Sequence, residues 1–247
     1  MSVSKELMTA LTRVTAAFVA LGALGLAACV AALAPSGPFT ARFAAGAYIM
    51  YGGVAAVVLA RISAFHPYPG FGAANVVTLA RLVLTSLFAG LTLDTAMLPL
   101  ALAPATAWLF VAMALVSLVL DGLDGSLARR LSLTSSFGSR FDMEVDALQI
   151  LLLSVLAYTL GKAGAWVLMG GLLRYIYVAA GWMWPALNRP LPPSLRRKVV
   201  CVIQIGALAA LLAPIIVPPV SNVIAFAALG LLTISFAQDV IWSLRAT

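Results

Sequence analysis

The sequence has 247 residues, of which 63% are hydrophobic and 9% are charged, and its mean hydropathy is +1.08. This composition excludes an ordinary soluble globular domain. A formal net charge of +7 is also typical of nucleic-acid-binding proteins, but here the basic residues flank long apolar stretches. The composition therefore predicts an integral membrane protein without a nucleic-acid partner.

Eight stretches along the chain are apolar over the ~20 residues that a membrane-spanning helix needs. They are residues 12–34, 43–63, 75–93, 98–120, 141–160, 164–187, 198–218 and 221–243. Together they occupy most of the chain and leave no room for a separate soluble domain. The predicted fold is an all-α polytopic membrane protein with eight transmembrane helices.

The basic residues are distributed unevenly between the two sides that these spans define. With both termini on one side, that side receives twelve of the fifteen Lys and Arg residues. The other side receives Arg42 and Lys162, and Arg174 falls within a span. The positive-inside rule then places both termini in the cytoplasm and the protein in the cytoplasmic (inner) membrane. The basic excess also suits contacts with anionic membrane lipids and anionic substrates.

The first two spans differ from the rest because they carry few polar residues. We predict an N-terminal transmembrane hairpin over residues 1–63 and a functional core over residues 64–247. Leu26-Ala27-Ala28-Cys29 also resembles a lipoprotein cleavage box, but the apolar run continues to Leu33, which favours an intact span. In the connector that follows, the single histidine, His66, is interpreted as an interfacial rather than a catalytic residue.

Polar residues gather at the start of the third span, where Asn75, Thr78 and Arg81 follow one another at helical spacing. Most of the acidic residues lie further on: five of the eight fall between Asp121 and Asp146. Carboxylates this close to a bilayer are costly and usually mark a functional site.

The aspartates of this segment form two pairs, each on one face of a helix. Asp121 and Asp124 are three residues apart, and Asp142 and Asp146 are four apart. Four convergent carboxylates repel one another unless cations lie between them, and oxygen ligands suit Mg²⁺ or Mn²⁺. The alternative is that they are solvated residues at helix ends. Glu144 points to another face and is expected to be solvated or salt-bridged.

The residues between the two pairs complete the pattern D-x2-D-G-x2-A-R-x8-G-x3-D-x3-D. Gly125 and Ala128 leave a strip with little side-chain volume, where a base or ribose can approach the backbone. Arg129 can pair with phosphate oxygens. Gly138, one turn before Asp142, allows the two helices that carry the aspartate pairs to come close together. Two cations held by such a site can bridge a pyrophosphate.

The whole pattern resembles the signature of the CDP-alcohol phosphatidyltransferase family, and Asn75, Thr78 and Arg81 resemble its N-x2-T-x2-R entry helix. The resemblance implies a six-helix core, to which the first two spans add a hairpin without counterpart in the minimal family fold. It also implies two metal ions, held by Asp121, Asp124 and Asp142 and touched by Asp146, the general base. The implied nucleotide-binding residues are Asn75, Thr78, Asp121, Gly125, Ala128 and Arg129.

By the same resemblance, the donor is CDP-diacylglycerol or a related CDP-lipid, the acceptor is a small polar alcohol, and CMP is released. Many members are homodimers. Arg197, Lys198 and Gln204 resemble a family segment, and Arg174 is the one basic residue well inside a span. We hypothesise that Arg174, Arg197 and Lys198 bind the phosphate of an acceptor such as glycerol-3-phosphate or inositol phosphate.

Alternatives remain for these residues and for the function. The basic run at residues 196–198 can serve membrane topology alone, and Arg174 can pair with an aspartate. An intramembrane prenyltransferase also binds a diphosphate through Mg²⁺, but its Asp-rich motifs typically lie on widely separated helices. A cation transporter requires polar residues across the midplane of the membrane, and the predicted non-cytoplasmic halves of the spans have almost none. Phospholipid biosynthesis by phosphatidyl transfer is therefore the favoured hypothesis.

Overall fold

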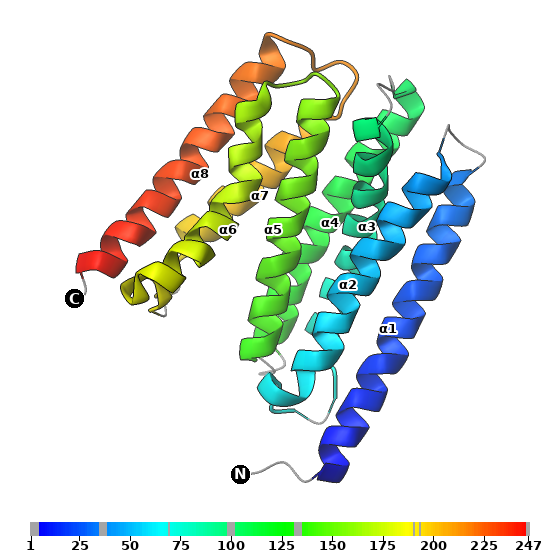
Figure 1. Cartoon of the computed structure of the whole chain (residues 1–247), viewed down its shortest axis with the longest axis vertical. Helices are drawn as coiled ribbons and strands as arrows, with labels where there is room; N and C mark the ends of the chain where they lie inside the picture. Colours follow the sequence, from blue (N-terminus) through cyan, green and yellow to red (C-terminus); the bar gives the residue numbers. More distant parts are fainter. Residues whose placement is uncertain are drawn as a thin grey trace. The chain divides into compact units, whose positions relative to one another are not determined.

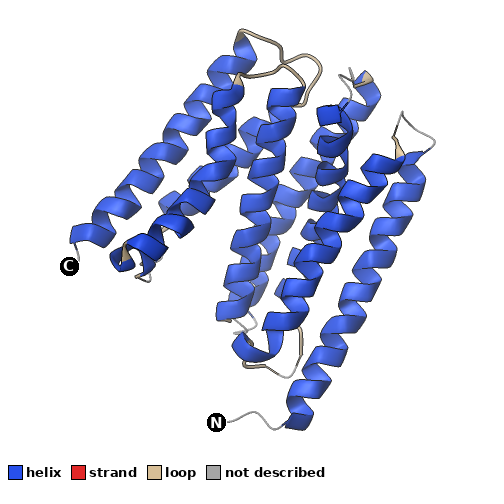
Figure 2. Cartoon of the chain, viewed as in Figure 1, coloured by secondary structure: helices blue, strands red, loops and turns tan. Residues whose placement is uncertain are grey.

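Helices make up most of the described part of the chain, which contains no strand (Figure 2). The computed structural model describes residues 5–34, 39–68, 70–97, 102–130, 135–189, 191–192 and 194–245, with only the backbone for residues 5–7, 97 and 123–130. The α-helices in this part are α1 (Lys5–Leu33), α2 (Ala41–Phe65), α3 (Ala73–Met97), α4 (Pro104–Arg130), α5 (Ser136–Thr159), α6 (Leu168–Met183), α7 (Leu195–Leu211) and α8 (Val220–Arg245). Short 3₁₀ helices, η2 (Ala165–Val167) and η3 (Pro185–Asn188), flank α6. The predicted all-α fold is confirmed.

Six of the described helical segments are long and apolar enough to cross a membrane: Met8–Leu33, Ala41–Phe65, Ala73–Ala96, Pro104–Gly122, Ala165–Met183 and Val220–Arg245. The chain is therefore a multi-pass membrane protein. The two other predicted spans correspond to α5, whose first turns carry three acidic residues, and to α7, which has 17 residues and a basic start. For these two helices the membrane span remains a prediction.

Two helices differ in extent from the apolar runs in the sequence. The run at 98–120 predicted a helix that ends before the first aspartate pair, whereas α4 starts at Pro104 and continues to Arg130. Proline at the first helical position costs nothing, because its missing N–H has no partner there. The run at 198–218 predicted a longer helix than α7, which ends at Leu211, shortly before Pro214. Proline disfavours helical backbone in the residue before it, so the apolar run outlasts the helix.

The chain divides into two compact units, the first of which comprises Met1–Leu98 and Leu115–Asp146. In this unit α1, α2 and α3 pack against one another (Figure 1). The two backbones of α2 and α3 meet at glycines: a Cβ on Gly46 would lie 2.9 Å from Ala89 O, and one on Gly90 would lie 2.5 Å from Phe43 O. Small residues allow such close helix packing in membranes. Of the six apolar segments, the one in α3 is the most buried.

The second unit comprises Pro99–Ala114 and Ala147–Thr247. Within it α8 packs against α6 and α7. The loop after α5 is fastened to the loop between α7 and α8, because Lys162 Nζ donates to Ala213 O at 3.0 Å and to Ile216 O at 2.7 Å. Ser221 Oγ in turn donates to Lys162 O at 2.5 Å. These bonds satisfy carbonyl groups at and beyond the C-terminal end of α7.

Candidate active site

Three of the four predicted metal-binding aspartates lie together in the first unit. Asp121 comes from α4, and Asp142 and Asp146 come from successive turns of α5. One carboxylate oxygen of each lies within 4.8 Å of the others. Their side chains are 21%, 34% and 17% exposed, so the cluster is accessible but largely enclosed. Convergence of carboxylates from two helices is what the spacing of the aspartates predicted.

The guanidinium of Arg81 lies among these three carboxylates. Its Nη1 donates to Asp142 Oδ1 and lies 3.0 Å from Asp121 Oδ1, and its Nη2 donates to Asp146 Oδ1. The Arg81 side chain is 0% exposed. The sequence placed Arg81 on the polar side of its helix but did not identify it as the partner of the acidic cluster.

The donor set fits a divalent cation. Carboxylate oxygens are the ligands that Mg²⁺ and Mn²⁺ prefer. The three partly buried carboxylates lie close together, and such a cluster is costly near a membrane unless cations compensate it. The cluster is therefore chemically suited to the metal that the sequence predicted.

Asn75 and Thr78, predicted to bind nucleotide, are buried on α3 at 4% and 2% exposure. Asn75 Nδ2 donates to Phe71 O at 2.5 Å, and Thr78 Oγ1 donates to Ala74 O at 3.1 Å. Asn75 Oδ1 faces α5, where a Cβ on Gly138 would lie only 2.8 Å from it. Gly138 therefore allows the start of α5 to approach the start of α3. The sequence predicted instead that Gly138 brings together the two helices that carry the aspartates, α4 and α5, and this role remains a prediction.

The connector before α3 binds the start of α5 through His66. His66 Nε2 lies 2.9 Å from Gly70 O, and its Nδ1 lies 3.0 Å from Ser135 Oγ. Because a carbonyl only accepts, Nε2 carries the proton and Nδ1 accepts from the hydroxyl in the neutral ring. Ser135 Oγ also accepts from Gly138 N at 2.9 Å, the bond of a helix N-cap. Burial lowers the pKa of His66, partly opposed by the bond to Gly70.

The other predicted nucleotide-binding residues and the fourth aspartate fall where only the helix backbone is described. Asp124, Gly125, Ala128 and Arg129 belong to α4, but their side chains lie outside the described residues. Their roles remain predictions.

The basic residues predicted to bind the acceptor belong to the second unit. Arg174 is half-buried on α6, and Lys198 is exposed on α7. Arg197 is bound within its own unit: it donates to Pro192 O and, at 3.2 Å, to Asp239 Oδ1. Asp239 pairs with two arginines of the same unit.

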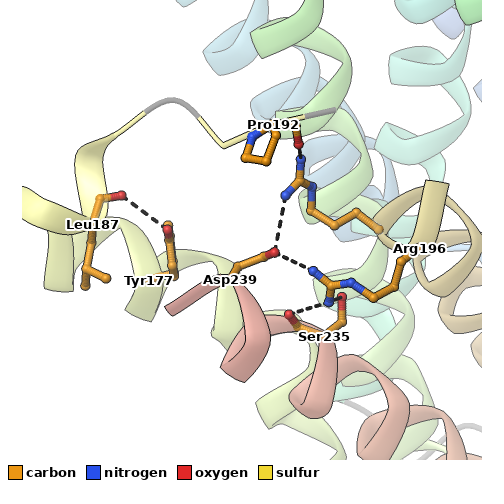
Figure 3. A network of polar contacts seen from close by, with 7 residues as sticks. Tyr177, Leu187, Pro192, Arg196, Ser235 and Asp239 are labelled. Atoms are coloured by element: carbon orange, nitrogen blue, oxygen red, sulfur yellow. Dashed lines mark hydrogen bonds and ion pairs between the residues drawn. The ribbon is translucent and has the colours of Figure 1, made fainter. Parts of the chain in front are cut away.

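The second of these arginines is Arg196, which also donates to Asp239 and holds α7 against α8 (Figure 3). Its Nη1 donates to the backbone oxygen and to the hydroxyl of Ser235, both at 2.6 Å. These residues adjoin a pocket of about 300 Å³ whose lining also includes Ser194 and Trp242. Two guanidinium groups and one carboxylate leave this place with one net positive charge, which suits an anion.

Comparison with protein-family models gives a match over residues 71–235, more than half of the chain, to the model described as CDP-alcohol phosphatidyltransferase. The chain belongs to the CDP-alcohol phosphatidyltransferase family. It is therefore a membrane-embedded phosphotransferase for substituted phosphate groups, with a CDP-alcohol donor and an alcohol acceptor, in phospholipid biosynthesis. No curated protein and no solved structure gives a significant match.

Proposed function

We propose that the enzyme transfers the phosphatidyl group of CDP-diacylglycerol to a small polar alcohol and releases CMP. The observation that carries this proposal is the convergence of Asp121, Asp142 and Asp146 in a chain of this family. The family match favours it over an intramembrane prenyltransferase and over a cation transporter. A donor whose acyl chains stay in the bilayer also suits an enzyme with several membrane-spanning helices.

The proposed cofactor is a pair of Mg²⁺ or Mn²⁺ ions held by Asp121, Asp124, Asp142 and Asp146. When bound, such ions neutralise a diphosphate and stabilise the attacking and leaving oxygens. The proximity of the three described carboxylates supports this assignment. Asn75, Thr78, Gly125, Ala128 and Arg129 are the proposed contacts of the cytidine nucleotide, together with Asp121.

Asp146 is the proposed general base. It accepts the proton of the acceptor hydroxyl while that oxygen forms a bond to the phosphorus on the lipid side. The bond from this phosphorus to the bridging oxygen breaks, and CMP leaves with that oxygen. The position of Asp146, half-buried and one helical turn beyond Asp142, supports a role close to the reacting atoms. A carboxylate serves here because the phosphoanhydride is already activated and needs positioning above all.

The proposed acceptor is phosphorylated, with glycerol-3-phosphate as the best candidate, and Arg174, Arg197 and Lys198 bind its phosphate. The concentration of basic residues at the start of α7 supports this choice. Arg197 already binds Asp239, so phosphate binding requires it to exchange or share that partner. We further propose that the enzyme lies in the cytoplasmic membrane with both termini and the site facing the cytoplasm, on the basis of the distribution of basic residues. The proposed homodimer rests only on the resemblance to a family in which many members are homodimers.

Incubation of the purified protein with CDP-diacylglycerol and a panel of alcohols tests the proposal, with lipid products identified by mass spectrometry. We expect CMP release that requires Mg²⁺ or Mn²⁺ and is lost in Asp146→Asn, with glycerol-3-phosphate as the preferred acceptor. Turnover of a different CDP-linked lipid would refute the donor. Preference for an uncharged alcohol would refute the acceptor assignment and leave the phosphatidyl transfer intact.

A further inference from the structure

The position of Arg81 bears on how the metal enters the site. Arg81 binds three carboxylates that come from two helices, and it comes itself from a third helix, α3. A buried arginine with three acidic partners cross-links α3, α4 and α5 by charge-assisted hydrogen bonds. Arg81 thereby offsets part of the repulsion that the three carboxylates exert on one another.

The oxygens that Arg81 holds belong to the carboxylates that can serve as metal ligands. Nη1 bridges Asp121 Oδ1 on α4 and Asp142 Oδ1 on α5, and Nη2 binds Asp146 Oδ1. A divalent cation that joins the two helices needs oxygens of the same three carboxylates, and a guanidinium among them repels that cation. Arg81 and the metal therefore compete for this cluster.

Arg81 keeps its positive charge when a metal displaces it from these carboxylates. The side chain is fully buried, so a displaced guanidinium requires a new anionic partner. The diphosphate of the donor supplies such a partner, since phosphate oxygens accept the paired N–H groups of arginine well. Metal binding and diphosphate binding then support each other through one side chain.

We propose that Arg81 is the resident counter-cation of the metal-free site, that it yields the carboxylates to the metal, and that it then binds the diphosphate of the nucleotide. It is a substrate-binding residue that makes tight metal binding depend on the presence of the substrate. The proposal rests on the metal site of the proposed function and adds to it a coupling between the two ligands.

Titration of the purified protein with Mn²⁺, followed by the electron paramagnetic resonance signal of the free ion, tests this coupling without any turnover. CDP serves as the soluble diphosphate probe, with correction for the Mn²⁺ that it binds in solution. We expect the wild type to bind Mn²⁺ about tenfold more tightly with saturating CDP, within the usual range for coupled sites. We expect Arg81→Gln to bind Mn²⁺ about tenfold more tightly than the wild type without CDP, and to gain less from CDP.

Two further variants make the result specific. Arg81→Lys keeps the charge but has one ammonium in place of a forked donor, so its affinity for Mn²⁺ should lie between those of the wild type and Arg81→Gln. Arg61→Gln removes the same charge from an exposed position on α2 and should behave as the wild type. If Arg81→Gln does not fold, Arg81→Lys still decides: Mn²⁺ binding no tighter than that of the wild type without CDP overturns the role of Arg81.

The outcomes separate the two proposals. Equal or weaker Mn²⁺ binding by Arg81→Gln, or wild-type Mn²⁺ affinity unchanged by CDP, overturns the role of Arg81 and leaves the metal site standing. Mn²⁺ binding that is absent from all variants, or unaffected by Asp142→Asn, overturns the metal site itself and the role of Arg81 with it.

Discussion

Thr40 donates two hydrogen bonds to the carboxylate of Asp94, one from its backbone N–H at 3.1 Å and one from its hydroxyl. Thr40 is also the N-cap of α2, where its Oγ1 accepts from Arg42 N at 3.0 Å. Asp94 lies near the C-terminal end of α3 and is 1% exposed. The pair therefore joins the start of one helix to the end of its neighbour by a buried charge.

Substitution of this charge should lower stability. In Asp94→Asn the buried group keeps its shape but loses the charge that strengthens both bonds, and its amide presents a donor to the Thr40 N–H or hydroxyl. We expect a loss of about 1–3 kcal/mol in the free energy of unfolding. Thermal unfolding in detergent measures it, with Thr40→Ser as the control, because serine keeps both donors. A melting temperature equal to that of the wild type would contradict this account.

The aspartate cluster should be sensitive to loss of single charges while its sequence neighbour is not. Asp121→Asn and Asp142→Asn each remove one oxygen ligand with little change in volume, and we expect CMP release to fall about 100-fold or more. Glu144→Gln makes the same chemical change between Asp142 and Asp146 but on another face of α5, and it should retain most of the activity. Equal losses in all three variants would refute the assignment of the site to one helix face.

Gly138 should not tolerate a side chain. The Cβ of Gly138→Ala would lie 2.8 Å from Asn75 Oδ1 and 3.1 Å from Ser135 Oγ, so α5 or α3 must shift. Small displacements of catalytic groups are costly, and we expect a loss of activity of about tenfold or more. Gly53→Ala on α2 is the matched control, because no heavy atom lies within 4 Å of its Cβ. Initial rates of CMP release compare the two variants at equal concentrations of folded protein.

His66 should make stability depend on pH. Burial lowers the pKa of His66 in the folded protein, so the unfolded chain binds its proton first as the pH falls. The stability contributed by the neutral ring is complete above the ordinary histidine pKa of about 6.5 and is lost as the pH falls from there through the folded pKa. The melting temperature should fall more between about pH 7 and about pH 5 in the wild type than in His66→Gln. Parallel pH profiles of the two proteins would contradict this prediction.

The sequence predicted what depends on local spacing. Apolar length is a property of each helix alone, so the helices were found from composition. The meeting of Asp142 with Asp146 follows in the same way from their separation of one helical turn. The start of α4 at Pro104 and the end of α7 before Pro214 could also be predicted from the prolines. Hydropathy alone extended both apolar runs beyond the helices.

What the sequence did not predict depends on how helices pack. Arg81 lies 40 residues before Asp121, and no spacing rule relates the two. The bond from Thr40 to Asp94 and that between His66 and Ser135 likewise join segments that are 54 and 69 residues apart. A signal for Arg81 was its position as the one basic residue of the apolar stretch 75–93, near its predicted cytoplasmic end, because a cation at such a place favours an anionic partner nearby.

The contact between Gly46 on α2 and Gly90 on α3 links the N-terminal helices to the position of Arg81 in the acidic cluster. Gly90 lies nine residues after Arg81 on the same helix, which corresponds to about 14 Å along its axis. Because a helix moves nearly as a rigid body, the position of α3 against α2 determines where the Arg81 guanidinium lies relative to the acidic residues. A larger side chain where α2 crosses α3 would therefore alter the position of Arg81, and with it the activity, without a change in any residue that contacts the substrate.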